Sequence, residues 1–419
     1  MSKSKKASSP VISIDAVQLE QEIKCCIASR VVPYVTSSPG IGKSQIVAKI
    51  AKERDLELID IRLSTAQPED LSGYPSKITD PITGKQKAEF IPFSFFPTVE
   101  DHLPLNEKGK KLFLELQTKL AHDKTLITQN INTSTLTPEN QKQLNALQDQ
   151  FEKDEAAIRA AHSMKGWLIL FDELSSAAKA MQAAAYKIIL DRQIGQFDLH
   201  ENAFIVAAGN RMEDNSVVFE MSKALASRMV HYELRSDVAA WLDWAFKAGI
   251  NSKVITFLNS SHGHLSMFDP DDVDRTFPCP RTWEMLSKLL DNSPEASHQI
   301  PVHRIGGVVG NAAANTFYNY CQYYLELPEF IKVVADPKNT NVPSDHAKKF
   351  AMSDMLATNE QLDHTNIAAI ISYVKRLPTD MQANFVNMAS RVNPKLTSKP
   401  SEPATPLETL AAQVIVVAT

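Results

Sequence analysis

The chain has 419 residues, of which 43% are hydrophobic and 22% charged, and its formal net charge at pH 7 is −5. This length allows two or three domains with a sizeable core. The negative net charge gives no overall attraction to nucleic acid, so contact with DNA or RNA would require local basic patches. No apolar run is long enough to span a bilayer, and we therefore expect no membrane segment.

The N-terminal stretch is basic over residues 1–6 and lacks the apolar segment of a signal peptide. Residues 1–10 are therefore expected to form a disordered basic tail. The cysteines form no CxxC pair and have no nearby histidine at metal-ligand spacing. We expect reduced thiols in a cytoplasmic protein. The four cysteines are Cys25, Cys26, Cys279 and Cys321.

A phosphate-binding loop is predicted at residues 37–44, which read SSPGIGKS. A β-rich run over 31–36 precedes the loop, and a helical pattern to about residue 52 follows it. This order of strand, loop and helix is the context that the motif requires. Pro33 lies in the predicted strand, and because proline lacks a ladder donor, we expect it at the start of the pairing or at a bulge.

The residue types in this loop suit a nucleotide. Gly40 and Gly42 let backbone N–H groups approach phosphates, Lys43 reaches the β- and γ-phosphates, and Ser44 offers a hydroxyl to Mg²⁺. The usual pattern begins with Gly, whereas Ser37 stands here, which is tolerable if its φ is negative. The alternative is an ordinary Gly-rich turn. The predicted nucleotide-binding residues are Ser38, Pro39, Gly40, Ile41, Gly42, Lys43, Ser44 and Gln45.

The segment after this helix predicts a second strand and a hairpin. Residues 56–63 are β-rich, and residues 64–73 form a polar excursion with turn signals. Residues 74–96 read as a hairpin with its tip near 83–84. The apolar stretch 90–96 is rich in phenylalanine, and we expect it in the core rather than in a partner-facing loop, because most large apolar side chains are buried.

A helical hairpin is predicted over residues 110–161, as an insertion at about 98–165. Leucines recur at helical spacing in each half, and the halves are separated by a polar turn ending at Thr137, a plausible N-cap followed by a first-turn proline. Two interpretations remain open. The insertion is either an arm for a substrate or partner, or a decoration that packs on a neighbouring subunit or on nothing, since long surface insertions cost little.

The second strong signal is a continuous apolar run, 167–171, that ends in Asp172 and Glu173. Such a run fits a parallel strand buried on both faces, and ligands of these sheets lie at the carboxyl ends of the strands. Asp172 is predicted to hold Mg²⁺, and Glu173 to polarise the water that attacks the γ-phosphate. A helix over 178–190 and a small hairpin over 192–199 are expected next.

Two further polar residues adjoin predicted strands. Asn210 follows the apolar strand 204–208 and could hold the attacking water, although Gly-Asn is also a common turn. Arg228 precedes the strand 229–234. It is either a surface charge or the arginine with which one subunit stabilises transition-state charge in its neighbour.

Residues 236–335 are predicted to be rich in helices. Ser236 is the expected cap of the first helix, and Gly249 its stop. Another helix begins at 279–283, CPRTW, where Arg281 is either a helix-start arginine or a sensor of the γ-phosphate. Within this region, the Gly-rich run 306–310 lacks the lysine and the preceding strand of a nucleotide loop, and reads as a helix entry.

The last quarter of the chain predicts a loop at 336–342 and amphipathic helices at 367–376 and 381–391. The composition of 393–406 is that of a linker. The apolar segment that follows is expected to dock either on a neighbouring chain or on its own helical region. The predicted organisation is a tail (1–10), a nucleotide-binding domain (11–235), a helical lid with an extension (236–392), and a linker with a C-terminal segment (393–419).

Taken in order, SSPGIGKS, LILFDEL, VAAGNR, LASRM and CPRTW resemble the AAA+ ATPases, and within them the MoxR-type branch. The resemblance is strongest over residues 31–234, and the DLSG element at 70–73 and the helix that follows Asp172 also look like that branch. It implies an α/β fold: a P-loop αβα sandwich with a parallel sheet, followed by an all-helical lid domain. Two features depart from the pattern, namely Ser37 and the length of the insertion between 96 and 165.

The resemblance also implies a function. It implies a ring, usually of six subunits, that hydrolyses ATP with Mg²⁺ at the subunit interfaces and remodels a protein partner. Such proteins often work with a partner that has a von Willebrand factor A domain. The alternatives are a motor or loader acting on DNA, which the acidic net charge disfavours, and a nucleotide-gated scaffold with low turnover, which the intact Glu173 and Arg228 disfavour.

Site roles are implied residue by residue. Lys43 and Ser44 contact phosphate and Mg²⁺, and Asp172 and Glu173 form the metal-water and catalytic pair. The resemblance further implies that Asn210 is the first sensor, that Arg228 is a finger acting in trans, and that Arg281 is the second sensor.

Overall fold

A computed structural model gives the structure of the chain and describes residues 12–79, 84–129, 137–211, 214, 219, 221–271, 275–294, 299–396 and 405–418. The predicted basic tail, 1–10, and most of the predicted linker, 397–404, lie outside the described residues. The described chain divides into two compact units. The first holds 12–14, 18–37 and the residues between 43 and 234, and the second holds 15–17, 38–42 and the residues from 235 onward.

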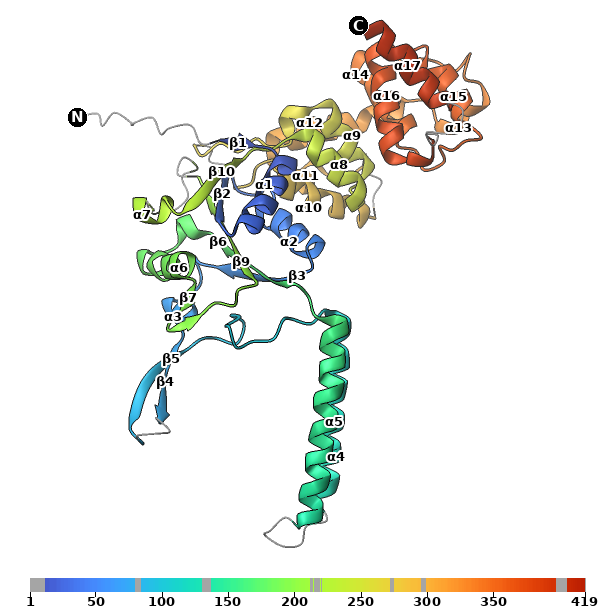
Figure 1. Ribbon diagram of the computed structural model, residues 1–419. Helices are drawn as coiled ribbons and strands as arrows, with labels where there is room; N and C mark the ends of the chain where they lie inside the picture. Colours follow the sequence, from blue (N-terminus) through green and yellow to red (C-terminus); the bar gives the residue numbers. More distant parts are fainter. Residues whose placement is uncertain are drawn as a thin grey trace, which may run out of the picture. The chain divides into compact units, whose positions relative to one another are not determined.

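The first unit is built on a six-stranded sheet in which every pairing is parallel (Figure 1). The α/β class expected from the sequence is therefore confirmed. From one edge to the other, the strands are β1 (Ser13–Ile14), β10 (Met229–Leu234), β2 (Val32–Ser37), β9 (Ala203–Asn210), β6 (Gly166–Asp172) and β3 (Leu56–Arg62).

Helices cover both faces of this sheet. On one face, α2 (Lys43–Glu53) packs on β3, β6 and β9, and ion pairs join it to α1 (Ala16–Ser29). On the other face, α6 (Lys179–Asp191) packs its buried side chains against alternate residues of β6 and β9. Six of the seven residues of β6 are buried, because both faces of that strand are covered. This is the expected αβα sandwich.

Pro33 lies at the second position of β2, between two neighbouring strands. Pairing of β2 with β9 begins only at the next residue, where Tyr34 lies opposite Ala207. The missing N–H of Pro33 therefore falls at the start of that pairing, as predicted.

The polar excursion after β3 contains a short helix, α3 (Pro68–Ser72), that the sequence analysis did not predict. The expected hairpin follows as β4 (Tyr74–Thr79) and β5 (Gln86–Ile91), which pair antiparallel. Residue 83, at the predicted tip of this hairpin, lies outside the described residues. The smaller hairpin is also present, as β7 (Gln193–Ile194) and β8 (Phe197–Asp198).

The phenylalanines of the stretch 90–96 were predicted to be core, and most are not. Phe96 is buried at 2% exposure, whereas Phe90, Phe93 and Phe95 are 46%, 37% and 43% exposed. The reason is that β4 and β5 form a separate two-stranded sheet, and a hairpin of this kind has no second layer to cover both faces. Phe93 and Phe95 instead stack on each other, with ring centroids 5.7 Å apart.

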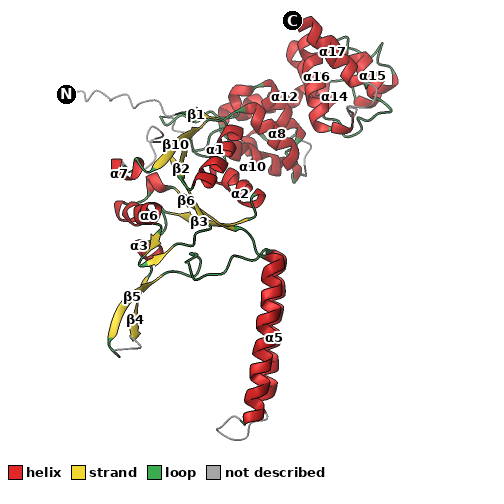
Figure 2. Ribbon diagram, viewed as in Figure 1, coloured by secondary structure: helices red, strands yellow, loops and turns green. Residues whose placement is uncertain are grey.

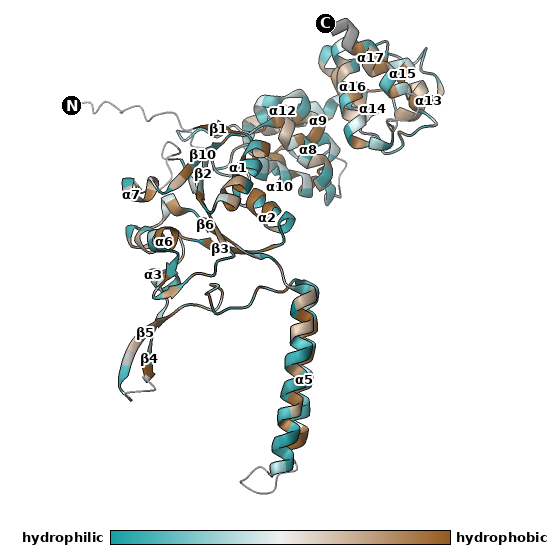
Figure 3. Ribbon diagram, viewed as in Figure 1, coloured by the Kyte–Doolittle hydropathy of each residue, from teal (hydrophilic) through white to brown (hydrophobic). Residues whose placement is uncertain are grey.

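The predicted helical hairpin is present as α4 (Glu107–Gln129) and α5 (Pro138–His162), which pack side by side along their length (Figure 1). Thr137 caps α5 by accepting a hydrogen bond from the N–H of Asn140, as expected. None of the described side chains of α5 is fully buried, and its surface is mainly hydrophilic with scattered apolar residues (Figure 3). The Phe113 and Phe151 rings, 6.3 Å apart, link the two helices.

The described part of the second unit contains helices and no strand (Figure 2). Its helices of eight or more residues are α8 (Val238–Ala248), α9 (Ser252–Ser260), α10 (Pro280–Asp291), α11 (Val302–Val309), α12 (Asn311–Tyr323), α14 (His346–Ala357), α15 (Ile367–Val374), α16 (Thr379–Val392) and α17 (Pro406–Ala418). The shorter α13 (Phe330–Ala335) precedes α14.

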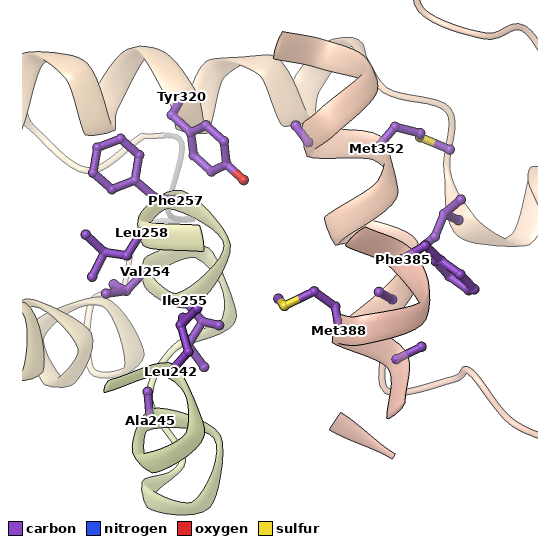
Figure 4. Packing of buried hydrophobic residues seen from close by; sticks show 14 of the residues in the cluster. Leu242, Ala245, Val254, Ile255, Phe257, Leu258, Tyr320, Met352, Phe385 and Met388 are labelled. Carbon is purple, nitrogen blue, oxygen red and sulfur yellow. The ribbon is translucent and has the colours of Figure 1, made fainter. Parts of the chain in front are cut away.

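One hydrophobic core runs through these helices. Figure 4 shows side chains of α8, α9 and α12 together with those of α14 and α16, including Phe257, Tyr320 and Phe385. The C-terminal segment joins the same core, since Leu407 and Leu410 of α17 are each 1% exposed. Two docking sites were expected for this segment, a neighbouring chain or its own helical region. In the structure it docks on its own helical unit.

Two local predictions in this unit are corrected, and one helix was not predicted. The cap of α8 is Asp237, which accepts from the N–H of Ala240, and not Ser236; Gly249 does end the helix, at φ 70°. Gly306 and Gly307 lie inside α11 rather than at a helix entry, and Gly310 separates α11 from α12. Helix α14 was not predicted, because its apolar residues show little of the periodicity on which such a prediction depends.

Candidate functional site at the carboxyl edge of the sheet

Apart from Arg228, the predicted site residues of the first unit meet where parallel strands end. Ser37 of β2 lies opposite Asn210 of β9, and Arg62 of β3 lies opposite Asp172 of β6. Because the strands are parallel, their carboxyl ends share one edge of the sheet, which is where ligands of such folds bind. We call Ser37, Lys43, Ser44, Asp172, Glu173 and Asn210 the sheet-edge cluster.

Lys43 is the first residue of α2, and its ammonium group reaches two oxygens at the ends of neighbouring strands. Nζ donates to Ser37 Oγ at 2.8 Å and to Asn210 Oδ1 at 3.4 Å. Ser37 is fully buried and has no left-handed φ, so this replacement of the usual glycine is tolerated as predicted. Ser37 was predicted only as a departure from the motif, and its contact with the lysine was not predicted.

Asp172 is held by two groups of the chain itself. Ser44 Oγ donates to Asp172 Oδ2 at 2.7 Å, and the backbone N–H of Glu173 donates to Asp172 Oδ1 at 2.8 Å. A hydroxyl and a carboxylate side by side are oxygen ligands of the kind that Mg²⁺ prefers. The donor set at this position therefore fits a magnesium ion.

Glu173 has an unusual backbone conformation. Its φ of 58° and ψ of 30° lie in the left-handed region, which non-glycine residues seldom adopt and which tends to occur at functional sites. Its carboxylate accepts a hydrogen bond from the hydroxyl of Ser64, just beyond the end of β3. Nearby, burial raises the pKa of Asp60, and the negative charges of Asp172 and Glu173 add to this shift. The positive charge of Arg62 opposes the shift, so the carboxylates at this edge lie near both Lys43 and Arg62.

The glycines of the loop 38–42 have the conformations that the motif requires. Gly40 and Gly42 have φ values of 80° and 100°. A Cβ on Gly40 would lie 2.5 Å from Cys279 Sγ, so this close approach also excludes a side chain. The carbonyl of Gly40 accepts a hydrogen bond of 3.1 Å from the backbone N–H of Arg281. The side chain of Arg281, at the start of α10, is exposed.

Asn210 is positioned by a residue that the sequence analysis missed. Ser175 Oγ accepts from the N–H of Asn210 at 2.9 Å and donates to its C=O at 3.1 Å. The same side chain forms a hydrogen bond with Tyr34, whose pKa is raised mainly by burial. No sequence signal distinguishes Ser175 from Ser176, because both follow the acidic pair in a short polar stretch.

Arg228 lies apart from the other predicted residues. It is exposed, donates to the carbonyl of Ala224 at 2.7 Å, and lies over the ring of Tyr186 at 5.6 Å. Its contacts are thus with α6 and with α7 (Lys223–Ala226), and not with the sheet-edge cluster.

The described residues offer no second site of another type. Among them, no group of three or more His, Cys, Asp or Glu residues is arranged to hold a metal. None of the described helices is both long enough and apolar enough to cross a membrane. All four cysteines are free thiols; Cys25 is exposed and the other three are buried.

Comparison with known proteins gives limited similarity. No family model matches the chain, and no curated protein matches it. Among solved structures, a chain described as a "putative ATPase" from Cytophaga hutchinsonii is 11% identical, with 90% of this chain and 81% of that chain covered and a TM-score of 0.30. A mutant RuvB of Thermotoga maritima is 12% identical, with 91% and 85% covered and a TM-score of 0.28. Similarity at this level assigns neither family nor function, so function is inferred from the sheet-edge cluster.

Proposed function

We propose that the chain is an AAA+ ATPase that binds ATP with Mg²⁺ at the sheet-edge cluster and hydrolyses it to ADP and phosphate. One observation carries the proposal. The ammonium of Lys43 lies between Ser37 and Asn210 while Ser44 bonds to Asp172 at 2.7 Å, and both pairs lie at the carboxyl edge of a parallel sheet. This is the arrangement in which a phosphate-binding lysine, a metal-binding hydroxyl and a metal-binding carboxylate work together.

Phosphate binding would involve residues 38–45. The glycine conformations leave backbone N–H groups free of Cβ obstruction, and the N-terminus of α2 adds a favourable dipole for an anion. Lys43 would exchange the neutral oxygens of Ser37 and Asn210 for phosphate oxygens. That exchange is favourable because a charge-assisted hydrogen bond is stronger than one to a neutral oxygen.

Ser44 and Asp172 would hold Mg²⁺, which neutralises charge on the phosphate oxygens when bound. Glu173 would accept the proton of the attacking water, since its carboxylate follows directly after the metal-binding residue. Asn210 would orient that water or the γ-phosphate through its side-chain amide.

Substitution of Lys43 by alanine tests the proposal. Lys43→Ala should abolish ATP binding, because it removes the cation that meets the phosphates. Lys49→Ala is the matched control: Lys49 lies on the same helix, but its ion pairs are with Glu20 and Glu53 on the helix surface. Titration calorimetry with ATP and Mg²⁺ measures both. Equal affinity in the two variants would contradict the site.

A finer part of the proposal concerns assembly and partners. We propose a MoxR-type protein that forms a ring of six, in which Arg228 acts on the ATP of a neighbouring subunit and Arg281 is the second sensor. The exposure of Arg228 and its separation from the cluster of its own chain support a role in trans. The sequence resemblance supports a protein partner with a von Willebrand factor A domain, and the free cysteines fit a reducing, cytoplasmic compartment.

Mixing two inactive variants tests the role in trans. Arg228→Ala and Glu173→Gln subunits should each bind ATP and lack turnover. Their mixture should recover activity, because an interface with an intact Glu173 on one side and an intact Arg228 on the other is complete. Arginine fingers contribute about a thousandfold or more in rate, so partial recovery is measurable. Labelled subunits first establish that exchange occurs. A mixture that exchanges and stays inactive would contradict the role in trans.

A further inference from the structure

We infer that Ser175 is a positioning residue for Asn210, and that its single hydroxyl group fixes the end of β9 against the acidic turn after β6. This inference rests on the proposed function and adds a residue to the same site. It follows from the way in which the hydrogen bonding of β9 ends.

The pairing between β6 and β9 stops before the site is reached. The last paired residues are Phe171 and Ala207, whereas β2 continues to pair with β9 as far as Asn210. On the β6 side, Asn210 therefore lies beyond the ladder. Backbone N–H and C=O groups near the interior require partners, so this residue needs a substitute for the missing strand.

Ser175 supplies that substitute. A hydroxyl has one donor and two acceptor positions, and Ser175 Oγ uses them to accept from the N–H of Asn210 at 2.9 Å and to donate to its C=O at 3.1 Å. Both backbone polar groups of Asn210 are thus held by one side-chain atom. Ser175 is 4% exposed, so water competes little for these bonds.

Ser175 is itself held in place by two other segments of the chain. It forms a hydrogen bond with Tyr34 of β2, and the backbone carbonyl of Ser175 accepts from the N–H of Phe219 at 2.8 Å. Gly209 makes the approach possible. A Cβ at Gly209 would lie 2.5 Å from the Tyr34 hydroxyl and 2.7 Å from Ser175 Oγ. The absence of a side chain at Gly209 therefore leaves room for these groups to meet.

Ser175 also lies two residues after Glu173, on the 3-10 turn Leu174–Ser176 that follows the left-handed residue. The proposed general base and the proposed sensor are thereby connected through one short turn. Movement of that turn would displace Asn210 relative to Lys43, whose Nζ lies 3.4 Å from Asn210 Oδ1. Displacement of a catalytic group by about 1 Å can lower a rate by about a hundredfold.

The test compares Ser175→Ala with Ser176→Ala. Ser176 lies on the same turn and is half-buried, and its hydroxyl has no hydrogen-bond partner recorded within the described part of the chain, which makes it a matched control. Ser175→Ala should lower the kcat for ATP hydrolysis by about tenfold to a hundredfold while the affinity for ATP changes by less than about twofold. Ser176→Ala should hydrolyse ATP at close to the unsubstituted rate.

A double-mutant cycle separates positioning from a general loss of structure. If Ser175 acts through Asn210, Ser175→Ala combined with Asn210→Ala should be no slower than Asn210→Ala alone. Losses that multiply would overturn the inference. Wild-type turnover in Ser175→Ala would overturn it as well, and in that case the proposed function would stand.

A second readout needs no nucleotide. In hydrogen exchange followed by mass spectrometry, a peptide ending after Asn210 should take up deuterium faster in Ser175→Ala than in Ser176→Ala, because the Asn210 amide loses its acceptor. Equal protection would overturn the inference. An unsubstituted chain that neither binds nor hydrolyses ATP, with exchange changed as expected, would instead overturn the proposed function and leave Ser175 as a clamp on β9.

Discussion

Two polar clusters in this chain use the same chemical groups and differ in their access to solvent. The sheet-edge cluster of the first unit combines carboxylates, hydroxyls and an amide with one lysine, and most of its members are half-buried. The second unit has a cluster around Asp354 of α14, which we call the Asp354 cluster. There, the carboxylate accepts from Asn384 at 2.7 Å, from Asn259 at 3.4 Å and from the Tyr320 hydroxyl at 3.4 Å.

The difference lies in charge and burial. Asp354 is fully buried, and its hydrogen-bond partners in the described part of the chain are neutral. Burial raises the pKa of Asp354 to about 7, although the three hydrogen bonds oppose the shift. A carboxylate that is sealed from solvent and lacks a cation cannot take part in reversible phosphate or metal binding. The comparison shows that the same polar groups stay open to solvent at a strand edge, where we propose the ligand site, and form a packing element between helices.

The largest expected effect comes from a substitution in the sheet-edge cluster. Glu173→Gln should keep ATP affinity and lower turnover by about 10² to 10⁴-fold, since the amide cannot accept the proton of the attacking water. Measurements of phosphate release and of ATP binding separate the two properties. Glu57→Gln on β3, which removes a surface ion pair with Lys110, is the control and should leave turnover unchanged. Normal turnover in Glu173→Gln would show that another residue is the general base.

The next largest effect concerns the Asp354 cluster. It should change the free energy of unfolding and not the rate of ATP hydrolysis. Asp354 binds its proton more tightly in the folded chain than in the unfolded chain, where the pKa is near 3.8. Stability should therefore fall as pH rises from about 4 to about 7, by up to about 4 kcal/mol in total. Asp354→Asn should remove this slope and should be more stable than the unsubstituted chain at pH 8.

Urea unfolding at several pH values measures the slope. Asp380→Asn is the control, because Asp380 is exposed and its partner is His346. A slope that persists in Asp354→Asn would show that another group titrates over this range.

The smallest expected effect comes from a second substitution in the Asp354 cluster. Tyr320→Phe removes one donor to Asp354 and keeps the ring in the core, so it should cost about 1 kcal/mol in unfolding free energy. Because that hydrogen bond lowers the pKa of Asp354, its loss should extend the pH dependence to higher pH. An unchanged midpoint of the pH profile would show that the 3.4 Å contact contributes nothing to the charge state of Asp354.

Much of the fold and part of the site could be predicted from short stretches of the sequence. The apolar run before Asp172 predicted a buried parallel strand, and the motif at 37–44 predicted a strand, a loop and a helix in the positions where they occur. Thr137 and Gly249 predicted where helices begin and end. These predictions succeeded because hydrophobic periodicity, caps and glycine conformations depend on residues within a few positions of each other.

The tertiary structure alone decided which residues are buried and which polar groups meet. Phe93 was predicted to be core, but it directly follows a hairpin that has no second layer, and its ring stays exposed. Ser175 and Asn210 are 35 positions apart in the chain, and Asn259 and Asp354 are 95 apart. A serine or an aspartate looks the same in the sequence whether it clamps a strand end, lies under a helix or faces water. Its burial and its hydrogen-bond partners come from distant segments, and these set both its pKa and its role.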